Sequence, residues 1–265
     1  MRIHALQTGS VRLKRAFLFP RSGVRRQLDL FLPGPWSDPV PILCWAIEHD
    51  DRLLLVDTGE VASARDVPFA RFEVEPQQEL PHALAAAGLA LEDVSEVVLT
   101  HHHGDHADGL VHVGDRRIRM GDAELAFIAT PFPRLMRRVL RQPLPDGFAP
   151  EPLVLAASPF GEFELSLPLS EDGRIVAVAT PGHTPGHISV ICIDDAERHV
   201  MLAGDVSDTL EQLHSRRPDA IAPDPKAHVV TLTRILAHCA RHPTVYLPSH
   251  DPDSTLRLAE GSTVS

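Results

Sequence analysis

One order of secondary-structure elements occurs twice along the chain, and this repeat restricts the possible folds more than any other feature. Short apolar runs that flank polar tips predict two β-hairpins. Their strands are expected at residues 42–48, 52–56, 188–193 and 199–203. The first hairpin ends at Asp57 and the second at Asp205, so each hairpin leads into an aspartate.

A helix and a further strand follow each aspartate. The first predicted helix follows Pro76 and ends at Gly88, a residue suited to a left-handed cap. The second has Asp224 as its N-cap and Pro225 at its first position. The strands that follow are expected at residues 96–100 and 244–247, and each leads into histidine.

The repeat predicts an α/β protein, a four-layer αβ/βα sandwich of two similar half-domains packed sheet to sheet. We expect residues 1–265 to form a single domain, with functional residues along the edge where both sets of strands end. Residues 128–172 fit neither half and include a basic helix around Arg134, Arg137, Arg138 and Arg141. This segment is either a solvated cap or part of a substrate lid.

Composition excludes several other classes of protein. With 43% apolar and 23% charged residues, the chain is neither disordered nor a small disulfide scaffold. No apolar run approaches the roughly 20 residues of a membrane span, so no membrane partner is expected. The net charge of −11 is unfavourable for binding nucleic acid.

Cysteine usage favours a reducing compartment. Cys44, Cys192 and Cys239 are far apart and form no CxxC pattern, so neither a disulfide framework nor a thiolate zinc site is indicated. The basic N-terminus lacks the apolar region of a secretory signal, although an organelle transit peptide stays open. We therefore expect a cytoplasmic protein.

Four histidines and two aspartates fall within residues 101–109, directly after a predicted strand. Alternate residues of an extended backbone share a face, so His101 and His103 can point together while His102 points away. Asp105 and His106 can turn around Gly104 toward the same space. Because burying several imidazoles together is costly without strong partners, this cluster predicts a divalent metal site.

Three later strand ends supply the remaining donors. His183 follows the strand expected at 175–179, Asp205 ends the second hairpin and His250 follows the last strand. The donors divide into two sets. One ion is expected on His101, His103 and His183, and a second on Asp105, His106 and His250, with Asp205 as a bridge. Such a set is typical of an open catalytic zinc centre.

These motifs resemble those of the metallo-β-lactamase superfamily over roughly residues 42–251. The His-x-His-x-Asp-His motif corresponds to residues 101–106, the later ligands to His183, Asp205 and His250, and the early Asp-Thr-Gly motif to residues 57–59. The resemblance implies the αβ/βα sandwich that the repeat also predicts. Histidine at position 103 points away from the diiron redox branch, where glutamate is typical.

Within that superfamily the chain is most similar to the quorum-quenching N-acyl homoserine lactonases. Chain length, the long loop after Asp57, the repeated Thr-Pro-Gly-His at residues 180–187 and the final Ser249-His250-Asp251 support this. A tyrosine that often follows the bridging aspartate by three positions is Asp208 here, and Tyr246 is the only tyrosine. Glyoxalase II thioesterases carry similar motifs but usually have an additional C-terminal extension.

The implied reaction is hydrolysis of a lactone or related ester by a hydroxide on two divalent ions, most simply Zn²⁺. Asp105 and Asp205 are the expected catalytic residues, and a small-molecule ester or lactone is the expected substrate. The alternatives are a glyoxalase II-like thioester hydrolase and a non-catalytic metal-binding protein on the same fold. The oligomeric state is left open.

Other polar residues have supporting or neutral roles in this interpretation. Asp57 is expected to hold a metal ligand or its loop. His187 and Asp251 either support the ligands or cap loops. Four further histidines are expected at the surface; they are His49, His199, His238 and His242.

Overall fold

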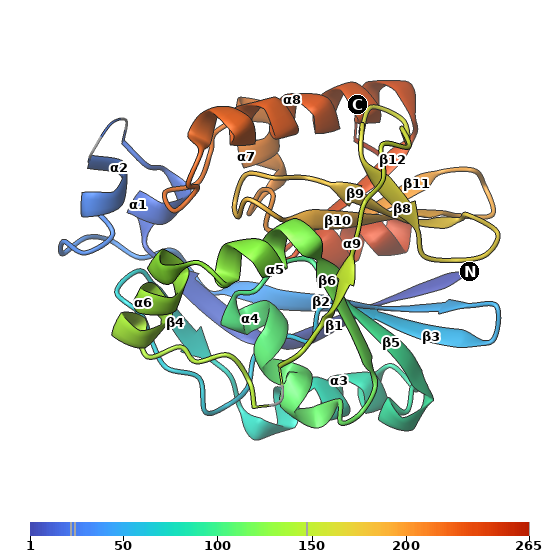
Figure 1. The fold of residues 1–265 in the computed structure, drawn as a ribbon, viewed down its shortest axis with the longest axis horizontal. Coiled ribbons are helices and arrows are strands. Elements are labelled where there is room, and N and C mark those ends of the chain that lie inside the picture. The colour runs from blue at the N-terminus through green and yellow to red at the C-terminus, as the bar shows by residue number, and fades with distance from the viewer. Residues whose placement is uncertain (22, 24, 147, 265) are drawn as a thin grey trace. The chain divides into compact units, whose positions relative to one another are not determined.

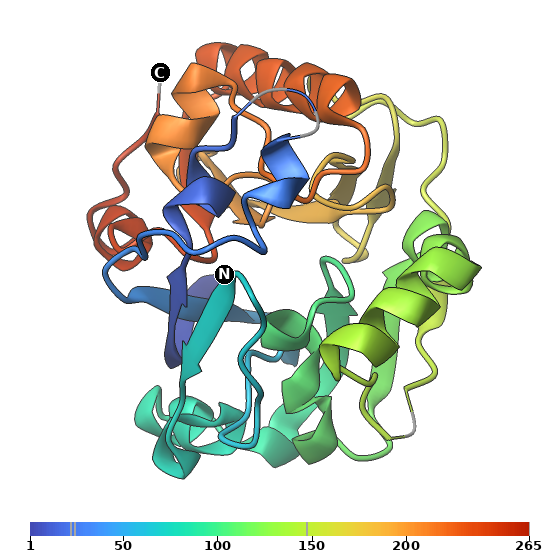
Figure 2. The same cartoon turned by 90° about the vertical axis from the view of Figure 1, so that its left-hand side faces the viewer.

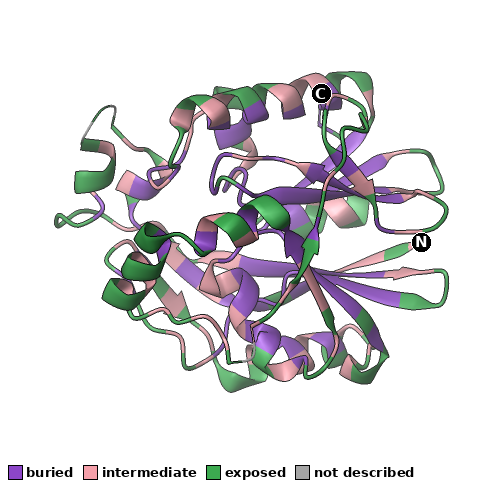
Figure 3. Cartoon of the chain, in the orientation of Figure 1, coloured by how far each residue is buried: buried purple, intermediate pink, exposed green. Residues whose placement is uncertain are grey.

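The computed structural model describes residues 1–21, 23, 25–146 and 148–264. Contacts within the chain divide it into two units. Unit 1 consists of Met1–Leu13 and Ser37–Leu153, and unit 2 of Lys14–Trp36 and Val154–Ser265. Each unit contains one β-sheet with its own buried core (Figure 3).

Unit 1 contains a mixed sheet in the spatial order β4-β1-β2-β3-β5-β6-β7 (Figure 1). The strands are β1 (Arg2–Leu13), β2 (Val40–His49), β3 (Arg52–Val56), β4 (Ala70–Glu73), β5 (Val94–Leu99), β6 (Arg117–Gly121) and β7 (Glu151–Leu153). The helices are α3 (Leu80–Ala86), α4 (Gly104–Ala107), α5 (Asp122–Ile128) and α6 (Pro131–Leu140). Three short 3₁₀ turns cover Pro76–Gln78, Leu91–Asp93 and Asp108–His112.

Unit 2 contains a sheet in the order β12-β11-β10-β9-β8. Its strands are β8 (Ser166–Pro168), β9 (Ile175–Ala179), β10 (Ile188–Ile193), β11 (His199–Gly204) and β12 (Thr244–Pro248). Its helices are α1 (Arg15–Leu18), α2 (Arg25–Leu28), α7 (Leu210–Ser215), α8 (Pro225–Arg241) and α9 (Ser254–Glu260). The long helix α8 runs along one face of this sheet (Figures 1 and 2).

The predicted repeat is confirmed within each unit. In unit 1 the hairpin β2–β3 is antiparallel, and β5 then pairs with β3 in parallel. In unit 2 the hairpin β10–β11 is antiparallel, and β12 pairs with β11 in parallel. Because a parallel strand needs a crossover connection, the helices α3 and α8 are the local consequence of this order.

The end of α3 and the start of α8 have the structures that their sequences indicate. Gly88, just beyond α3, has φ +77°, the left-handed conformation that glycine adopts at least cost. Asp224 accepts hydrogen bonds from the backbone N–H groups of Lys226 and Ala227, and Pro225 occupies the first turn of α8. Leu80 and Leu84 of α3 are buried in the core of unit 1.

Several strands were not predicted from the sequence. The largest is β1, whose residues include the basic N-terminal segment and which pairs with both β2 and β4. The three cysteines are free thiols and buried, as the absence of a disulfide pattern predicts. Of the helices in the described ranges, none has the length and apolar character needed to span a membrane.

The expected surface position of two histidines is wrong. His199 and His238 are buried, and His199 Nδ1 lies 2.8 Å from His238 Nε2. His242 stacks on His199 with ring centroids 4.7 Å apart, and Phe160 stacks on both His199 and His238. The sequence places these residues on a strand edge and a helix, but paired neutral imidazoles satisfy part of each other's hydrogen bonding, which permits burial.

Candidate metal centre

The predicted motif of unit 1 begins where two parallel strands end. Asp57 follows β3, and Thr100 and His101 follow β5. The Asp57 backbone N–H donates to the Val98 carbonyl at 2.9 Å, which fixes the end of β3 beside β5. Polar residues from two segments of the chain therefore meet at one sheet edge.

Unit 1 brings together the four predicted ligands of residues 101–106. His101 Nε2 lies 2.9 Å from His103 Nδ1, and the rings of His101 and His106 have centroids 4.2 Å apart. Asp105, in the first turn of α4, has its Oδ1 atom 4.0 Å from His106 Nε2. His101 and His106 are fully buried, so their polar atoms gather in a region shielded from water.

Asp57 holds this group in position. Its Oδ2 atom lies 2.8 Å from His106 Nδ1, and Thr100 donates to its two oxygens through the backbone N–H at 2.7 Å and Oγ1 at 2.8 Å. A carboxylate accepts only, so His106 carries its proton on Nδ1 and leaves Nε2 with a lone pair. The expectation that Asp57 holds a residue of the histidine motif is confirmed.

The rest of the Asp-Thr-Gly motif anchors α4. Thr58 donates to the His106 carbonyl through its backbone N–H at 2.8 Å and its hydroxyl at 2.9 Å. Gly59 has φ +72°, and a Cβ there would lie 2.0 Å from Thr8 Oγ1. Glycine is therefore required at this position by both conformation and space.

His102 points away from its neighbours, as alternation predicts. Its Nδ1 atom forms a hydrogen bond with the carboxylate of Glu124, which is fully buried on α5. Glu124 was not singled out from the sequence, because nothing in a helical segment marks the partner of a residue 22 positions away.

Unit 2 brings together the other three predicted ligands. His183 follows β9, Asp205 follows β11 and His250 follows β12. Asp205 Oδ2 lies 3.6 Å from His183 Nε2 and 3.4 Å from His250 Nε2. All three residues are buried, so this unit also gathers imidazole and carboxylate donors at strand ends.

A second carboxylate orients His183. Asp219 Oδ2 lies 2.8 Å from His183 Nδ1, and Asp219 also accepts from the backbone N–H groups of Ile221 and Ala222. Burial alone lowers the pKa of His183, but Asp219 and then Asp205 outweigh it and raise the pKa to about 9. Asp219 was missed from the sequence, because it lies in a loop without periodicity.

His187 and Asp251 have different roles. His187 Nε2 accepts from the backbone N–H of Asp205 at 3.2 Å, so this histidine supports the loop that carries a predicted ligand. Asp251 accepts from the Leu210 backbone N–H at 3.0 Å and from Arg257 Nη2 at 2.8 Å. It therefore ties the start of α7 to α9.

Tyr246 does not supply a free hydroxyl. Its ring is fully buried, and its hydroxyl oxygen lies 2.7 Å from Ser207 Oγ. Asp208 is buried, and burial together with Asp205 raises its pKa to about 7. Its backbone N–H donates to the side chain of Gln212.

The donor chemistry of both units fits divalent metal ions. Imidazole and carboxylate are ordinary ligands of Zn²⁺ and related ions. In His106 and His183 the Nδ1 atom is held by a carboxylate, and His101 Nδ1 lies 3.1 Å from Thr100 Oγ1. A ligand histidine in proteins is typically oriented by such a hydrogen bond on its other nitrogen.

Comparison with known proteins gives a family and a fold. Residues 37–250 match the metallo-beta-lactamase superfamily model. A probable metallo-hydrolase of Mycobacterium tuberculosis is 30% identical over 182 residues, which are 63% of this chain and 57% of that protein. An N-acyl homoserine lactonase of a Bacillus species is 27% identical over 202 residues, 71% of this chain and 72% of the relative.

Solved structures share the architecture at low sequence identity. An N-acyl homoserine lactone hydrolase with N-hexanoyl-L-homoserine at its catalytic metal centre has a TM-score of 0.74 at 18% identity, with 96% of this chain and 94% of that chain covered. A dizinc quorum-quenching lactonase has a TM-score of 0.66 at 18% identity, covering 94% and 87%. These likenesses confirm the predicted α/β fold class. The family match extends over most of the chain and includes both groups of predicted ligands, so the chain belongs to the metallo-beta-lactamase superfamily.

Proposed function

We propose that the chain is a metal-dependent hydrolase that opens lactones or related carboxylic esters. The observation that carries this proposal is the same in both units. Buried histidines and aspartates gather at strand ends, and a carboxylate binds the Nδ1 atom of His106 in one unit and of His183 in the other. The lactonase relative, which matches 71% of this chain, supports the choice of a cyclic ester.

The proposed ligands are those that the sequence motifs indicate. His101, His103 and His183 would hold one ion, and Asp105, His106 and His250 a second, with Asp205 shared between them. Bound Zn²⁺ or a similar ion supplies a Lewis acid and lowers the pKa of water toward neutrality. Within each unit, Asp57 and Asp219 bind the Nδ1 atoms of His106 and His183 and so fix the direction of each Nε2 atom. An ion bound at His183 would displace the Nε2 proton that this residue carries at neutral pH.

Asp105 is the proposed carrier of a proton to the leaving group. Its side chain keeps 14% exposure, whereas His106 beside it has none. A carboxylate that is partly accessible can exchange protons with substrate or solvent while α4 fixes its position.

Asp208 is expected to shape substrate preference. It occupies the position where similar lactonases often have tyrosine, and Tyr246 is already bonded to Ser207. One neutral hydrogen bond contributes roughly 0.5–1.5 kcal/mol. We therefore expect acyl homoserine lactones to be opened more slowly than by such enzymes, by roughly two- to tenfold.

We also propose that residues 1–265 act as one domain, with residues 128–172 contributing to the substrate-binding region. Helix α6 in this range lines a cavity of unit 1. The three buried free thiols favour a reducing compartment such as the cytoplasm.

Metal analysis and a substrate panel test the proposal. Metal-loaded protein should contain two ions per chain and hydrolyse lactones. His103→Ala should lose one ion and most activity, whereas the control His214→Ala changes an exposed histidine of α7 and should lose neither. The panel should include lactones of several acyl lengths, thioesters and a phosphodiester.

The outcomes separate the alternatives. A thioester preference would favour a glyoxalase II-like hydrolase, and metal binding without turnover of any ester would favour a non-catalytic protein. A phosphodiester rate above every lactone rate, or one ion or none in fully loaded protein, would contradict the proposal.

A further inference from the structure

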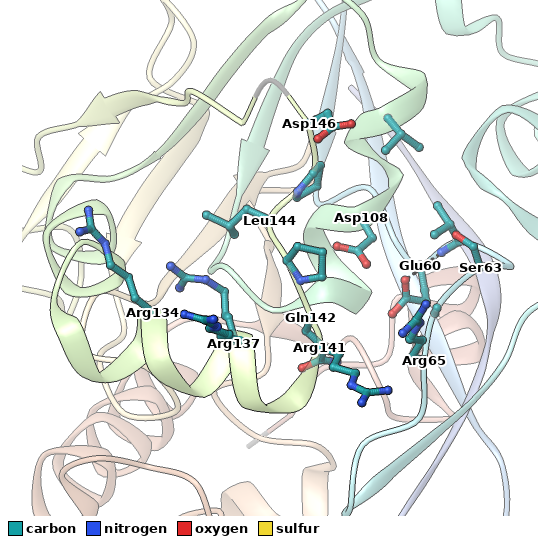
Figure 4. Close-up of a pocket in the computed structure, with 16 residues that line it drawn as sticks. Glu60, Ser63, Arg65, Asp108, Arg134, Arg137, Arg141, Gln142, Leu144 and Asp146 are labelled. Atoms are coloured by element: carbon teal, nitrogen blue, oxygen red, sulfur yellow. Dashed lines mark hydrogen bonds between the residues drawn. The ribbon is translucent and has the colours of Figure 1, made fainter.

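Unit 1 contains a cavity of about 770 Å³, and none of its lining residues belongs to the proposed ligand set. Its walls come from the loop after Gly59, the turn at Asp108, helix α6 and the chain that follows α6 (Figure 4). Arg134 and Arg137 lie at one end of the cavity, and Glu60 and Asp108 at the other (Figure 4). Leu144 and two neighbouring prolines supply apolar wall between them.

Helix α6 presents an arginine face to this cavity. Arg134, Arg137, Arg138 and Arg141 all line it, and their spacing places them on one side of a helix. Apolar side chains of the same helix are also exposed: Phe132 keeps 68% exposure, Leu135 57% and Val139 62%. Arg134, Arg138 and Arg141 are exposed at the cavity wall, and Arg137 is half-buried.

The arginines lack carboxylate partners. Within the described ranges, none of the four arginines of this face forms an ion pair. Arg137 Nη2 donates to the Ile128 carbonyl at 3.1 Å, but its Nη1 atom is buried and has no hydrogen-bond partner. Burial, and then Arg134, lower the pKa of Arg137, so this guanidinium is held where its charge is destabilised. A buried cationic donor without an acceptor is costly unless a ligand supplies one.

The local charge is opposite to that of the whole chain. The cavity lining includes five arginines, Arg65 among them, against the three acids Glu60, Asp108 and Asp146. The cavity is therefore positive in a protein of net charge −11.

We propose that this cavity binds the carboxylate or phosphate group of a small anionic molecule. Arg137 would be the central donor, with Arg134 and Arg138 beside it, because guanidinium groups bind such oxygens in a bidentate manner. Asp108 lies directly after α4, so the occupant sits beside the predicted ligand motif of the same unit. On the basis of the proposed function, the preferred ester or lactone carries this anionic group.

Direct binding tests the site without relying on turnover. Metal-loaded protein is titrated calorimetrically with glutarate and, separately, with inorganic phosphate. At least one should bind, and the double variant Arg134→Gln/Arg137→Gln should weaken binding about tenfold or more. Arg137→Lys should retain part of the affinity, because lysine keeps the positive charge but cannot donate two parallel hydrogen bonds as a guanidinium does. Arg2→Gln, at an exposed arginine of β1, is the matched control.

Thermal unfolding confirms that each variant folds. Equal affinity in wild type and the double variant would mean that the anion binds elsewhere, for example to the metal, and would overturn the proposal. The same holds if neither anion binds the wild-type protein.

A matched substrate pair tests the link to the reaction. A γ-lactone with a free carboxylate should have a kcat/KM about tenfold above that of the same lactone with a primary amide in its place. The double variant should lose this preference. If no lactone is hydrolysed while arginine-dependent binding persists, the anion site stands and the proposed function fails. If both lactones are hydrolysed equally and no anion binds, the proposed function stands and the anion site fails.

Discussion

Asp57 illustrates how much one side chain fixes in this protein. It has φ +64°, a conformation that aspartate and asparagine tolerate better than most residues. One oxygen accepts from the Thr100 backbone, and the other faces both Thr100 Oγ1 and His106 Nδ1. At the scale of the residue, the Asp57 carboxylate thus accepts hydrogen bonds that fix the orientation of Thr100 and His106.

Asp57→Asn should lower metal affinity about 10- to 100-fold, measured by competition with a chelator. An asparagine amide has one NH₂ group, which would replace one of the two accepting oxygens. In one orientation this NH₂ group faces the Thr100 backbone N–H, and in the other it faces His106 Nδ1. A bond to His106 Nδ1 would move the ring proton to Nε2, which then could not bind metal.

The control for that change is Asp51→Asn. Asp51 also has positive φ, at +55°, but it is exposed on the β2–β3 turn. Its substitution should leave metal affinity unchanged. An Asp57→Asn protein that binds metal as tightly as the wild type would show that the carboxylate does not control the His106 tautomer.

At the scale of elements, the N-cap of α8 is a local stabilising feature. Asp224 accepts two backbone hydrogen bonds at the start of a 17-residue helix. Asp224→Ala should lower the free energy of unfolding by about 0.5–2 kcal/mol, measured by urea denaturation.

Asp253→Ala is its matched control. Asp253 occupies the N-cap of α9, but its side chain forms no capping hydrogen bond. Its removal should change the free energy of unfolding by less than about 0.5 kcal/mol. Equal losses in both variants would refute the capping argument for Asp224.

At the scale of the whole molecule, the buried histidines of unit 2 make stability depend on pH. Burial, and then His199 and His242, lower the pKa of His238 from 6.5 to about 3. Between these values the unfolded chain binds a proton at His238 that the folded chain does not. The free energy of unfolding therefore falls as the pH drops below about 6.5, by at most roughly 1.4 kcal/mol per pH unit from this group.

His238→Gln should reduce that slope, measured by urea denaturation at several pH values between about 6.5 and 4.5. His214→Gln removes an exposed histidine of α7 and should keep the wild-type slope. The difference in slope reports His238 together with its effect on the bonded partner His199. Identical slopes for wild type and His238→Gln would contradict a neutral, buried His238.

Features encoded in a few consecutive residues could be predicted from the sequence. The two hairpins, the cap Asp224-Pro225 and the end of α3 at Gly88 depend on local patterns of apolar, capping and turn residues. The motif around His101 could also be predicted, because strand alternation determines which of its side chains can point together. The observed contacts between His101 and His103, and between His102 and Glu124, follow that alternation.

Features that depend on partners far along the chain were decided only by the tertiary structure. Strand β1 has no clear alternating pattern, and its pairing with β2 and β4 identifies it as a strand. Asp219 meets His183 from 36 positions away, and His199 meets His238 from 39. The arginine spacing of α6 is visible in the sequence, but the cavity that this face lines is not. The physical reason is common to all of these: burial and hydrogen bonding depend on which surfaces the fold brings together, and local sequence does not encode the position of a distant partner.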